Sequence, residues 1–180
     1  DVYMDKLAIG PNYPTDLVTL EMTPTQRVNA LAQAKGCATS DITVCVLERP
    51  RHQELIAELR LTGAAIRVIT DGDVAGVMHC AEAEVTGIDM YMGTGGAPEG
   101  VLAAAALKCM GGQIYGRLTF RNADEKKRAD SAGITDLDRI YTTRVGLTYL
   151  IREAMQAPDL KNLCHLVHHF GGQLAPVGAF

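Results

Sequence analysis

Two arginines, Arg49 and Arg51, flank Pro50 and are the strongest candidates in the sequence for binding a phosphate group. A guanidinium is planar and permanently charged, and it can donate two parallel hydrogen bonds to one phosphate. The proline stiffens the backbone and suits the first position of a helix, whose positive end also attracts an anion. The pattern predicts a phosphate contact, although two surface arginines paired with neighbouring glutamates would have the same sequence.

Two aspartates, Asp71 and Asp73, flank Gly72 shortly after the arginines. Their carboxylates could accept hydrogen bonds from sugar hydroxyls or hold a hard cation through oxygen ligands. An ordinary turn, in which Asp73 caps the following helix, would have the same sequence. The two roles are compatible, so both stay open.

The segment 93–100 is rich in glycine and contains Pro98 and Glu99. We expect a loop that leads into a helix with Pro98 in its first turn, because glycines let backbone N–H groups approach a ligand. Glu99 could bind a metal ion, but one carboxylate cannot build a metal site. Tight packing between a strand and a helix would need the same glycines. No Gly-Lys-Ser/Thr follows, so the segment is not a nucleotide-binding P-loop.

Histidines offer weaker candidates. Three of them, at positions 165, 168 and 169, have the spacing of metal ligands on one helix face, but no glutamate lies between them as it does in zinc proteases. We therefore interpret His165, His168 and His169 as non-ligands, and His52 and His79 stand alone in the sequence.

Short apolar runs at 42–47, 65–69 and 88–92 predict strands, and helical patterns lie between them. Helices are expected at about 24–35, 50–61, 73–80 and 98–110. This alternation predicts an α/β fold with a mixed, largely parallel sheet and flanking helices. Because ligands bind at the carboxyl ends of such strands, the three candidate segments should converge at one edge of the sheet.

Composition fits one globular domain and limits the partners. The chain has 180 residues, of which 21% are charged, and a net charge of −4, which argues against nucleic acid or anionic membrane as a partner. Any attraction for an anion must therefore be local.

Five scattered cysteines suit a reducing compartment. No apolar run reaches the roughly 18 residues of a membrane span and no signal peptide is evident, so we expect a cytoplasmic protein.

Four segments together resemble the class II fructose-1,6-bisphosphatases: 1–6, 49–52, 71–75 and 95–101. They occur in the order and approximate spacing of that family. The amino-acid sequence near residues 116–118 and 134–143 is most similar to the cyanobacterial type of this family, which also accepts sedoheptulose-1,7-bisphosphate. The resemblance covers residues 1–144 and implies the C-terminal half of a sugar-phosphatase fold. Residues 145–180 do not match the family and are expected to form a mainly helical tail.

The resemblance also implies a site and an activity. The family hydrolyses the 1-phosphate of its sugar bisphosphates with Mg²⁺ or Mn²⁺, in the Calvin cycle and gluconeogenesis. It is commonly oligomeric, and the cyanobacterial type is inhibited by AMP. Glu99 would be the one metal ligand from this half, since the family places its other metal-binding carboxylates in a preceding segment. The residues that would contact the sugar bisphosphate are Tyr3, Arg49, Pro50, Arg51, Asp71, Gly72, Asp73 and Gly96.

Two alternatives remain open from the sequence. A chain with one metal-binding carboxylate could be a non-catalytic sugar-phosphate-binding or regulatory module. It could also be an assembly subunit whose partner supplies the other metal-binding residues.

Overall fold

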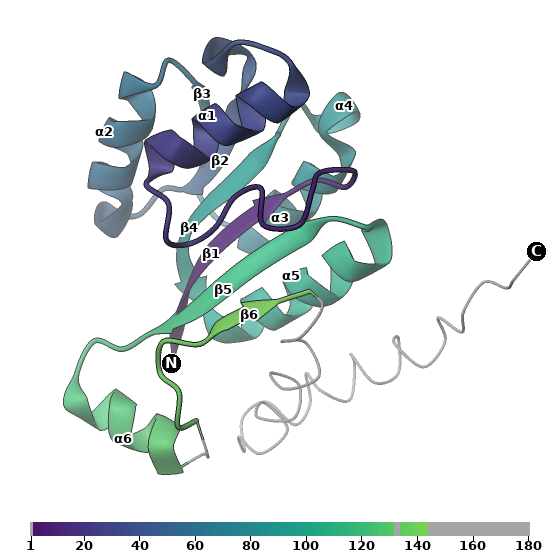
Figure 1. Cartoon of the computed structure of the whole chain (residues 1–180). Coiled ribbons are helices and arrows are strands. Elements are labelled where there is room, and N and C mark those ends of the chain that lie inside the picture. Colours follow the sequence, from purple (N-terminus) through teal and green to yellow (C-terminus); the bar gives the residue numbers. More distant parts are fainter. Residues whose placement is uncertain (1, 132–133, 144–180) are drawn as a thin grey trace, which may run out of the picture.

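The computed structural model describes residues 2–131 and 134–143, which form one mixed sheet with helices on both faces (Figure 1). The strand order is β3-β2-β4-β1-β5-β6. The pairs β2–β3 and β2–β4 are parallel, whereas β1–β4, β1–β5 and β5–β6 are antiparallel. The strands are β1 (Tyr3–Ile9), β2 (Thr43–Leu47), β3 (Ala65–Ile69), β4 (Met90–Gly96), β5 (Gln113–Thr119) and β6 (Ile140–Thr142).

Helices α1 and α2 cover one face of the sheet, and α3 and α5 cover the other (Figure 1). The helices are α1 (Pro24–Lys35), α2 (Gln53–Leu61), α3 (Asp73–His79), α4 (Ala83–Thr86), α5 (Ala97–Met110) and α6 (Ala123–Ser131). Short 3₁₀ turns lie at Thr39–Asp41, Pro50–His52 and Cys80–Glu82.

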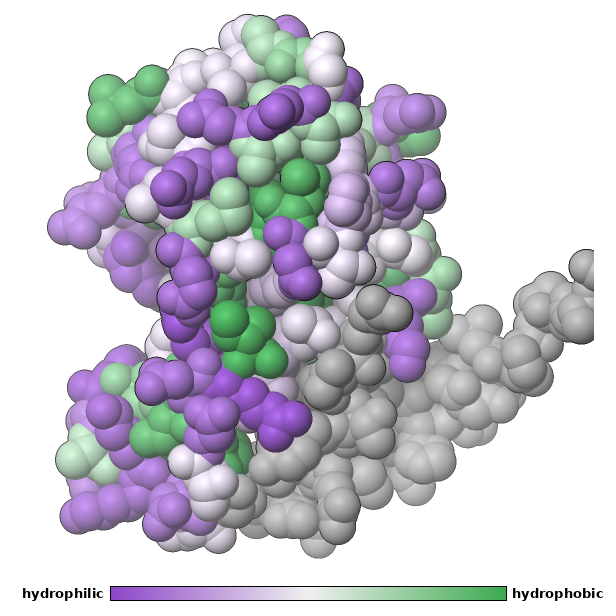
Figure 2. Space-filling model, in the orientation of Figure 1, coloured by the Kyte–Doolittle hydropathy of each residue, from purple (hydrophilic) through white to green (hydrophobic). Residues whose placement is uncertain are grey.

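Strand β1 shows how the sheet forms two cores. Leu7 and Ile9 pack against α1 and α2, while Ala8 packs against α3 and α5, because successive side chains point to opposite faces. Met4 belongs to a third cluster, beside α5 and β6. The exposed face in Figure 2 is mostly hydrophilic, with apolar side chains reaching the surface along its middle.

Local signals explain α1. Thr23 accepts a hydrogen bond from the Gln26 backbone N–H, and the Gln26 side chain accepts one from the Thr23 N–H, which completes a capping box. Pro24 occupies the first turn, and the helix ends at Gly36 in the left-handed conformation with a φ of 70°. These ends agree with the sequence prediction.

The predicted α/β fold with a mixed sheet is confirmed, and the predicted parallel strands are β2, β3 and β4. The antiparallel pairings outnumber the parallel ones by three to two in the described residues, because β1, β5 and β6 join the sheet and were not predicted. The helix expected from residue 50 begins as the 3₁₀ turn Pro50–His52 before α2.

The glycine-rich segment differs most from its prediction. Residues 93–96 belong to β4, which runs on to Gly96 and pairs with β1 from Ile9↔Met90 to Tyr3↔Gly96. Glycine is weak in strands, so the sequence favoured a loop. The partner strand β1 supplies the ladder that overrides this preference.

The expected tail at 145–180, with His165, His168 and His169, lies outside the described residues. In the part of the chain that the structure describes, no helix is both long enough and apolar enough to cross a membrane.

Two leucines of α2 allow a direct test of the core. Leu59 is fully buried, whereas Leu61, two residues later, is 88% exposed. Leu59→Ala should lower the free energy of unfolding by about 2–5 kcal/mol, because it removes buried apolar area and leaves a cavity. Leu61→Ala, the matched control, should change it by less than about 0.5 kcal/mol. Urea unfolding measures both, and equal effects would contradict the position of α2.

Candidate functional site

The ends of four strands meet at one edge of the sheet. Strands β2, β3 and β4 point the same way, so Leu47, Ile69 and Gly96 end near one another. Because β1 is antiparallel to β4, its first residue, Tyr3, lies at the same edge and pairs with Gly96. The convergence predicted from the sequence is thus confirmed in its geometry.

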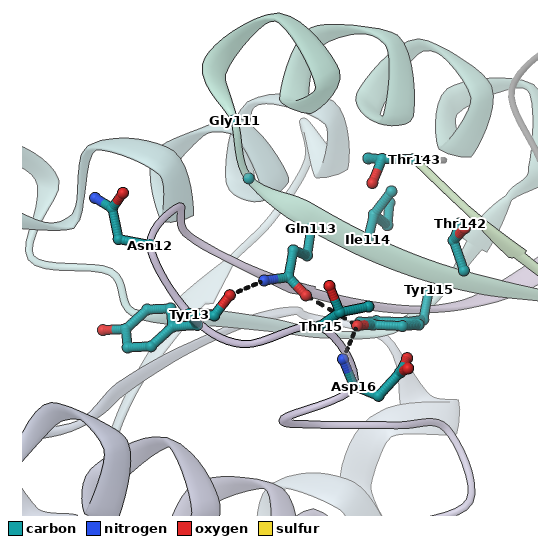
Figure 3. A pocket seen from close by; sticks show the side chains of 11 residues that line it. Asn12, Tyr13, Thr15, Asp16, Gly111, Gln113, Ile114, Tyr115, Thr142 and Thr143 are labelled. Carbon is teal, nitrogen blue, oxygen red and sulfur yellow. Dashed lines mark hydrogen bonds between the residues drawn. The ribbon is translucent and has the colours of Figure 1, made fainter. Parts of the chain in front are cut away.

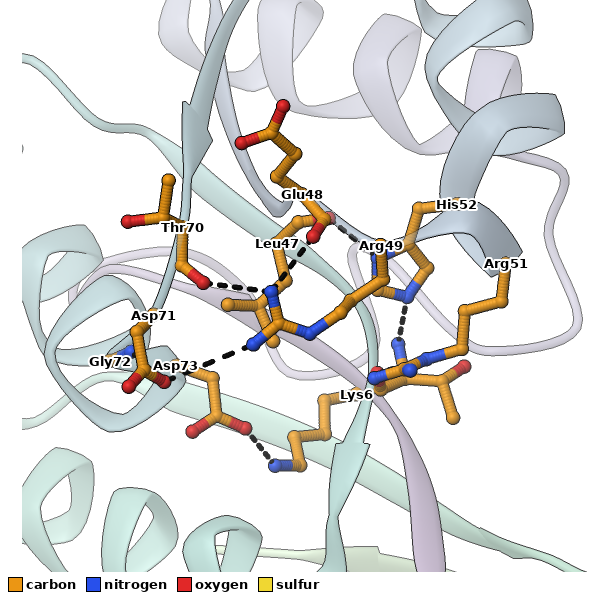
Figure 4. A network of polar contacts seen from close by, with 11 residues as sticks. Lys6, Leu47, Glu48, Arg49, Arg51, His52, Thr70, Asp71, Gly72 and Asp73 are labelled. Carbon is orange, nitrogen blue, oxygen red and sulfur yellow. Dashed lines mark hydrogen bonds and ion pairs between the residues drawn. The ribbon is translucent and has the colours of Figure 1, made fainter.

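Arg49 connects the loops after β2 and β3 (Figure 4). One terminal nitrogen, Nη1, donates hydrogen bonds to the backbone oxygens of Glu48 at 2.8 Å and Thr70 at 2.7 Å. Nη2 lies 4.0 Å from Oδ1 of Asp71, whose side chain is 95% exposed. Pro50 follows and begins the 3₁₀ turn, as its fixed φ allows.

Arg51 connects the loop after β2 to β4. Its Nε and Nη2 both donate to the backbone oxygen of Thr94, at 2.9 and 2.6 Å. The guanidinium also lies over the Tyr3 ring, 5.0 Å from its centroid, and Arg121 lies 4.9 Å from the same centroid. The Arg121 guanidinium and backbone N–H both donate hydrogen bonds to the buried carboxylate of Glu125. Two cations thus contact one aromatic ring at this edge.

His52, which stood alone in the sequence, is a buried cross-link. The Thr94 backbone N–H donates to its Nε2 at 2.8 Å, so Nε2 carries no proton and Nδ1–H donates to the Leu47 oxygen at 2.7 Å. Burial lowers the pKa of His52, which favours this neutral form. Gly93 has a φ of 145°, and a Cβ there would lie 3.0 Å from the imidazole. Only glycine fits beside this ring.

Asp73 forms a buried ion pair with Lys6 of β1 (Figure 4). Lys6 Nζ lies 2.5 Å from Asp73 Oδ2, and the two side chains are 1% and 10% exposed. Burial lowers the pKa of Lys6, while the hydrogen bond to Asp73 acts in the opposite direction. The alternative that Asp73 caps the helix is not what the structure shows: Gly72 is the N-cap of α3, with a φ of 83°, and Asp73 is the first helical residue.

Three glycines make room for these charged side chains. A Cβ at Gly95 would lie 2.5 Å from Asp73 Oδ2, and one at Gly100 would lie 3.2 Å from Lys6 Cε. A Cβ at Gly96 would collide with the carboxylate of Glu99. Close packing thus accounts for these glycines, which the sequence had left open.

Glu99 lies exposed in the first turn of α5. Within residues 2–131 and 134–143, no three His, Cys, Asp or Glu side chains come together in a way that could hold a metal ion. Among the described residues, Glu99 could therefore supply at most one of the ligands that a metal ion needs.

A cavity of about 580 Å³ lies at the far end of β1 and β5, away from this edge (Figure 3). Gln113, which lines it, pairs with Ile9 rather than with the Tyr3 end of β1. Gln113 Nε2 donates to the Tyr13 oxygen at 2.8 Å, and its Oε1 accepts from the Tyr115 hydroxyl at 2.9 Å. None of the residues predicted to contact a ligand lines this cavity.

Sequence reasoning missed Lys6, His52 and Thr94 as members of the site. A lysine inside the otherwise largely apolar strand β1 was a usable signal, since lysine is almost never fully buried without a partner. Thr94 contributes only its backbone N–H and oxygen, which every residue type except proline has, so its residue type could not identify it.

The neutral His52 gives a test in solution. As the pH falls below the ordinary histidine pKa of 6.5, the unfolded chain takes up a proton that the folded protein resists. Stability should therefore fall with falling pH, with a contribution of at most about 1.4 kcal/mol per pH unit. His52→Gln should reduce this slope, whereas exposed His79→Gln should keep it. Urea unfolding from about pH 7.5 to about pH 5.5 measures the slope; identical slopes in both variants would contradict the cross-link.

Comparison with known proteins places this chain in a family. Residues 1–147 match the family described as bacterial fructose-1,6-bisphosphatase, glpX-encoded. The D-fructose 1,6-bisphosphatase class 2/sedoheptulose 1,7-bisphosphatase of Prochlorococcus marinus strain NATL1A is 40% identical over 154 residues, which cover 78% of this chain and 46% of the relative. The proteins of the same name from strains MIT 9303 and MIT 9313 give the same identity and coverage. The chain spans about half the length of these curated relatives, and it belongs to the glpX-encoded family of bacterial fructose-1,6-bisphosphatases.

Proposed function

We propose that this chain supplies the sugar-bisphosphate contacts and one metal ligand of a metal-dependent phosphatase. The substrates are fructose-1,6-bisphosphate and sedoheptulose-1,7-bisphosphate, which are the two activities in the relatives' names. The observation that carries the proposal is the convergence of Arg49, Arg51 and Asp73 at the sheet edge beside Tyr3. In a chain of net charge −4, this edge brings two guanidinium groups, which can bind phosphate, next to two carboxylates, which can accept hydrogen bonds from sugar hydroxyls.

The phosphate groups and the hydroxyl groups of a sugar bisphosphate differ in chemistry, and so do the side chains of the loops. Arg51 and Arg49 would bind phosphate, next to Tyr3 and to Pro50, which begins the turn that carries Arg51. Asp71 and Asp73 would accept hydrogen bonds from the sugar hydroxyls, with Gly72 between them fixing the turn. Gly96 would let the ligand approach the backbone at the end of β4.

The arginine side chains are already oriented. Arg49 and Arg51 donate to backbone oxygens of the neighbouring loops, so little freedom would be lost when an anion binds. These cations would neutralise and align the phosphate.

Mg²⁺ or Mn²⁺ would, when bound, activate water and neutralise developing charge. Glu99 would be one ligand of this ion. The other ligands would be oxygens of the substrate phosphate and the carboxylates that the family places in a preceding segment. Magnesium commonly binds through one or two carboxylates plus substrate phosphates, which suits a single ligand at the first turn of α5.

The wider setting follows from family likeness. We propose a homo-oligomer that works in the Calvin cycle and gluconeogenesis, with AMP as an effector, as in the cyanobacterial type. A cytoplasmic location agrees with the free thiols of Cys37, Cys45, Cys80 and Cys109.

Binding of fructose-1,6-bisphosphate in EDTA tests the contacts of the chain itself. Arg51→Ala should weaken binding about 10- to 100-fold, because it removes charge-assisted hydrogen bonds to phosphate. Arg60→Ala, an exposed arginine on α2, is the matched control and should change affinity less than about twofold. Isothermal titration calorimetry gives both values. Absence of binding by the unaltered chain would refute the proposal.

The metal role has its own test. Mn²⁺ should tighten binding of fructose-1,6-bisphosphate to the unaltered chain by about tenfold, and EDTA should reverse this, because Glu99 would help to hold an ion that attracts the substrate phosphate. Glu99→Gln should lose the enhancement, whereas exposed Glu84→Gln should keep it. An equal enhancement in Glu99→Gln would remove Glu99 from the metal site. Phosphate release, followed in parallel, reports whether this chain alone completes the reaction.

A further inference from the structure

Lys6 has an unusual environment for a lysine. It is 1% exposed, it lies in the middle of a seven-residue strand, and its stem passes Gly100 while its ammonium passes Gly95. A lysine is almost never buried so completely without a partner. Here the partner is Asp73, and the two residues are 67 positions apart. The glycines on either side keep the path from β1 to α3 open.

The ion pair between Lys6 and Asp73 involves only one of the two oxygens of the Asp73 carboxylate. Lys6 contacts Oδ2, and among the described residues Oδ1 of Asp73 makes no hydrogen bond. Figure 4 shows this second oxygen turned away from the lysine, on the side of the loop 70–72. A carboxylate held by one oxygen presents the other in a fixed direction.

Stability does not explain the pair well. Removing an ammonium and a carboxylate from water costs several kcal/mol, and apolar residues of similar volume often stabilise a fold equally well. Two further charges surround Lys6: Glu99 favours the ammonium, and Arg51 opposes it. Lys6 therefore pairs with a residue expected to contact sugar and is within electrostatic reach of residues expected to contact metal and phosphate.

We infer that Lys6 is a positioning residue for the substrate, which fixes the Asp73 carboxylate so that its second oxygen accepts a sugar hydroxyl. The inference rests on the proposed function, since it assigns Asp73 to the sugar rather than to the phosphate. The inference predicts that loss of Lys6 weakens the affinity for the sugar bisphosphate and leaves the affinity of the arginines for inorganic phosphate unchanged. A purely structural role would weaken both.

The test compares two ligands on the same protein. Affinities for fructose-1,6-bisphosphate and for inorganic phosphate are measured by calorimetry for the full chain and for Lys6→Met. The variant should bind the sugar bisphosphate about tenfold more weakly and phosphate within about twofold of the unaltered chain. Lys35→Met is the matched control, because Lys35 also pairs with a carboxylate, Asp89 at 2.6 Å, but away from this edge; both of its affinities should stay unchanged.

A double variant tests whether Lys6 affects sugar-bisphosphate binding through Asp73 or through other residues. Lys6→Met combined with Asp73→Asn should bind the sugar bisphosphate no more weakly than Asp73→Asn alone, within about twofold, because the lysine acts only by holding that carboxylate. If Lys6→Met does not fold, Lys6→Gln, which keeps a donor near Oδ2, takes its place and should show a smaller selective loss.

Each outcome is decisive. If the unaltered chain does not prefer the sugar bisphosphate over phosphate, the proposed function fails and the inference fails with it. If the unaltered chain has this preference and the Lys6 variants keep it in full, only the inference fails. An equal loss of both affinities, or additive effects in the double variant, would likewise overturn it.

Discussion

The ion pair between Lys6 and Asp73 constrains this edge of the protein more than any other contact. It joins the first strand of the sheet to the first residue of α3, across the end of β4. Because the Lys6 ammonium is buried, water cannot take the place of Asp73 as its partner, and the backbone around the pair must leave room for both side chains. The pair thereby sets where α3 begins and how closely β4 and α5 approach β1.

The glycine-rich segment follows from this constraint. Gly95 and Gly100 lack side chains at the two places where the lysine and its carboxylate pass, and Gly96 does so under Glu99. Gly93 similarly admits the ring of His52, which fixes the backbone of Thr94 and, through it, Arg51. The last four residues of β4, 93–96, thus leave room for the Lys6 ammonium, the His52 ring and the Asp73 carboxylate. A loop would leave these groups without a rigid support.

These contacts also explain what the sequence could and could not predict. The parallel strands β2 and β3 were visible as short apolar runs, and α1 was visible through Thr23, Pro24 and Gly36, because such signals are local. Strand β1 was not, since Asp5 and Lys6 interrupt its apolar pattern, and the partner of Lys6 is 67 positions away. The same limit applies to the site: the arginines and aspartates were identifiable by type, whereas Lys6, His52 and the Thr94 backbone owe their roles to residues more than 40 positions away. Long-range pairing leaves no periodicity in a single sequence.

The arrangement of charge at this edge follows from a division between rigid and accessible groups. His52 and Lys6 are buried and make their hydrogen bonds entirely within the protein, so they hold the loops in place. Arg51 and Asp71 are exposed, and Asp71 in particular extends almost wholly into solvent. The Arg51 guanidinium, held on the Thr94 oxygen and open to solvent, can meet an anion without reorganising, whereas the exposed Asp71 carboxylate can accept hydrogen bonds from sugar hydroxyls. The buried members give that edge its geometry, and the exposed members give it its affinity.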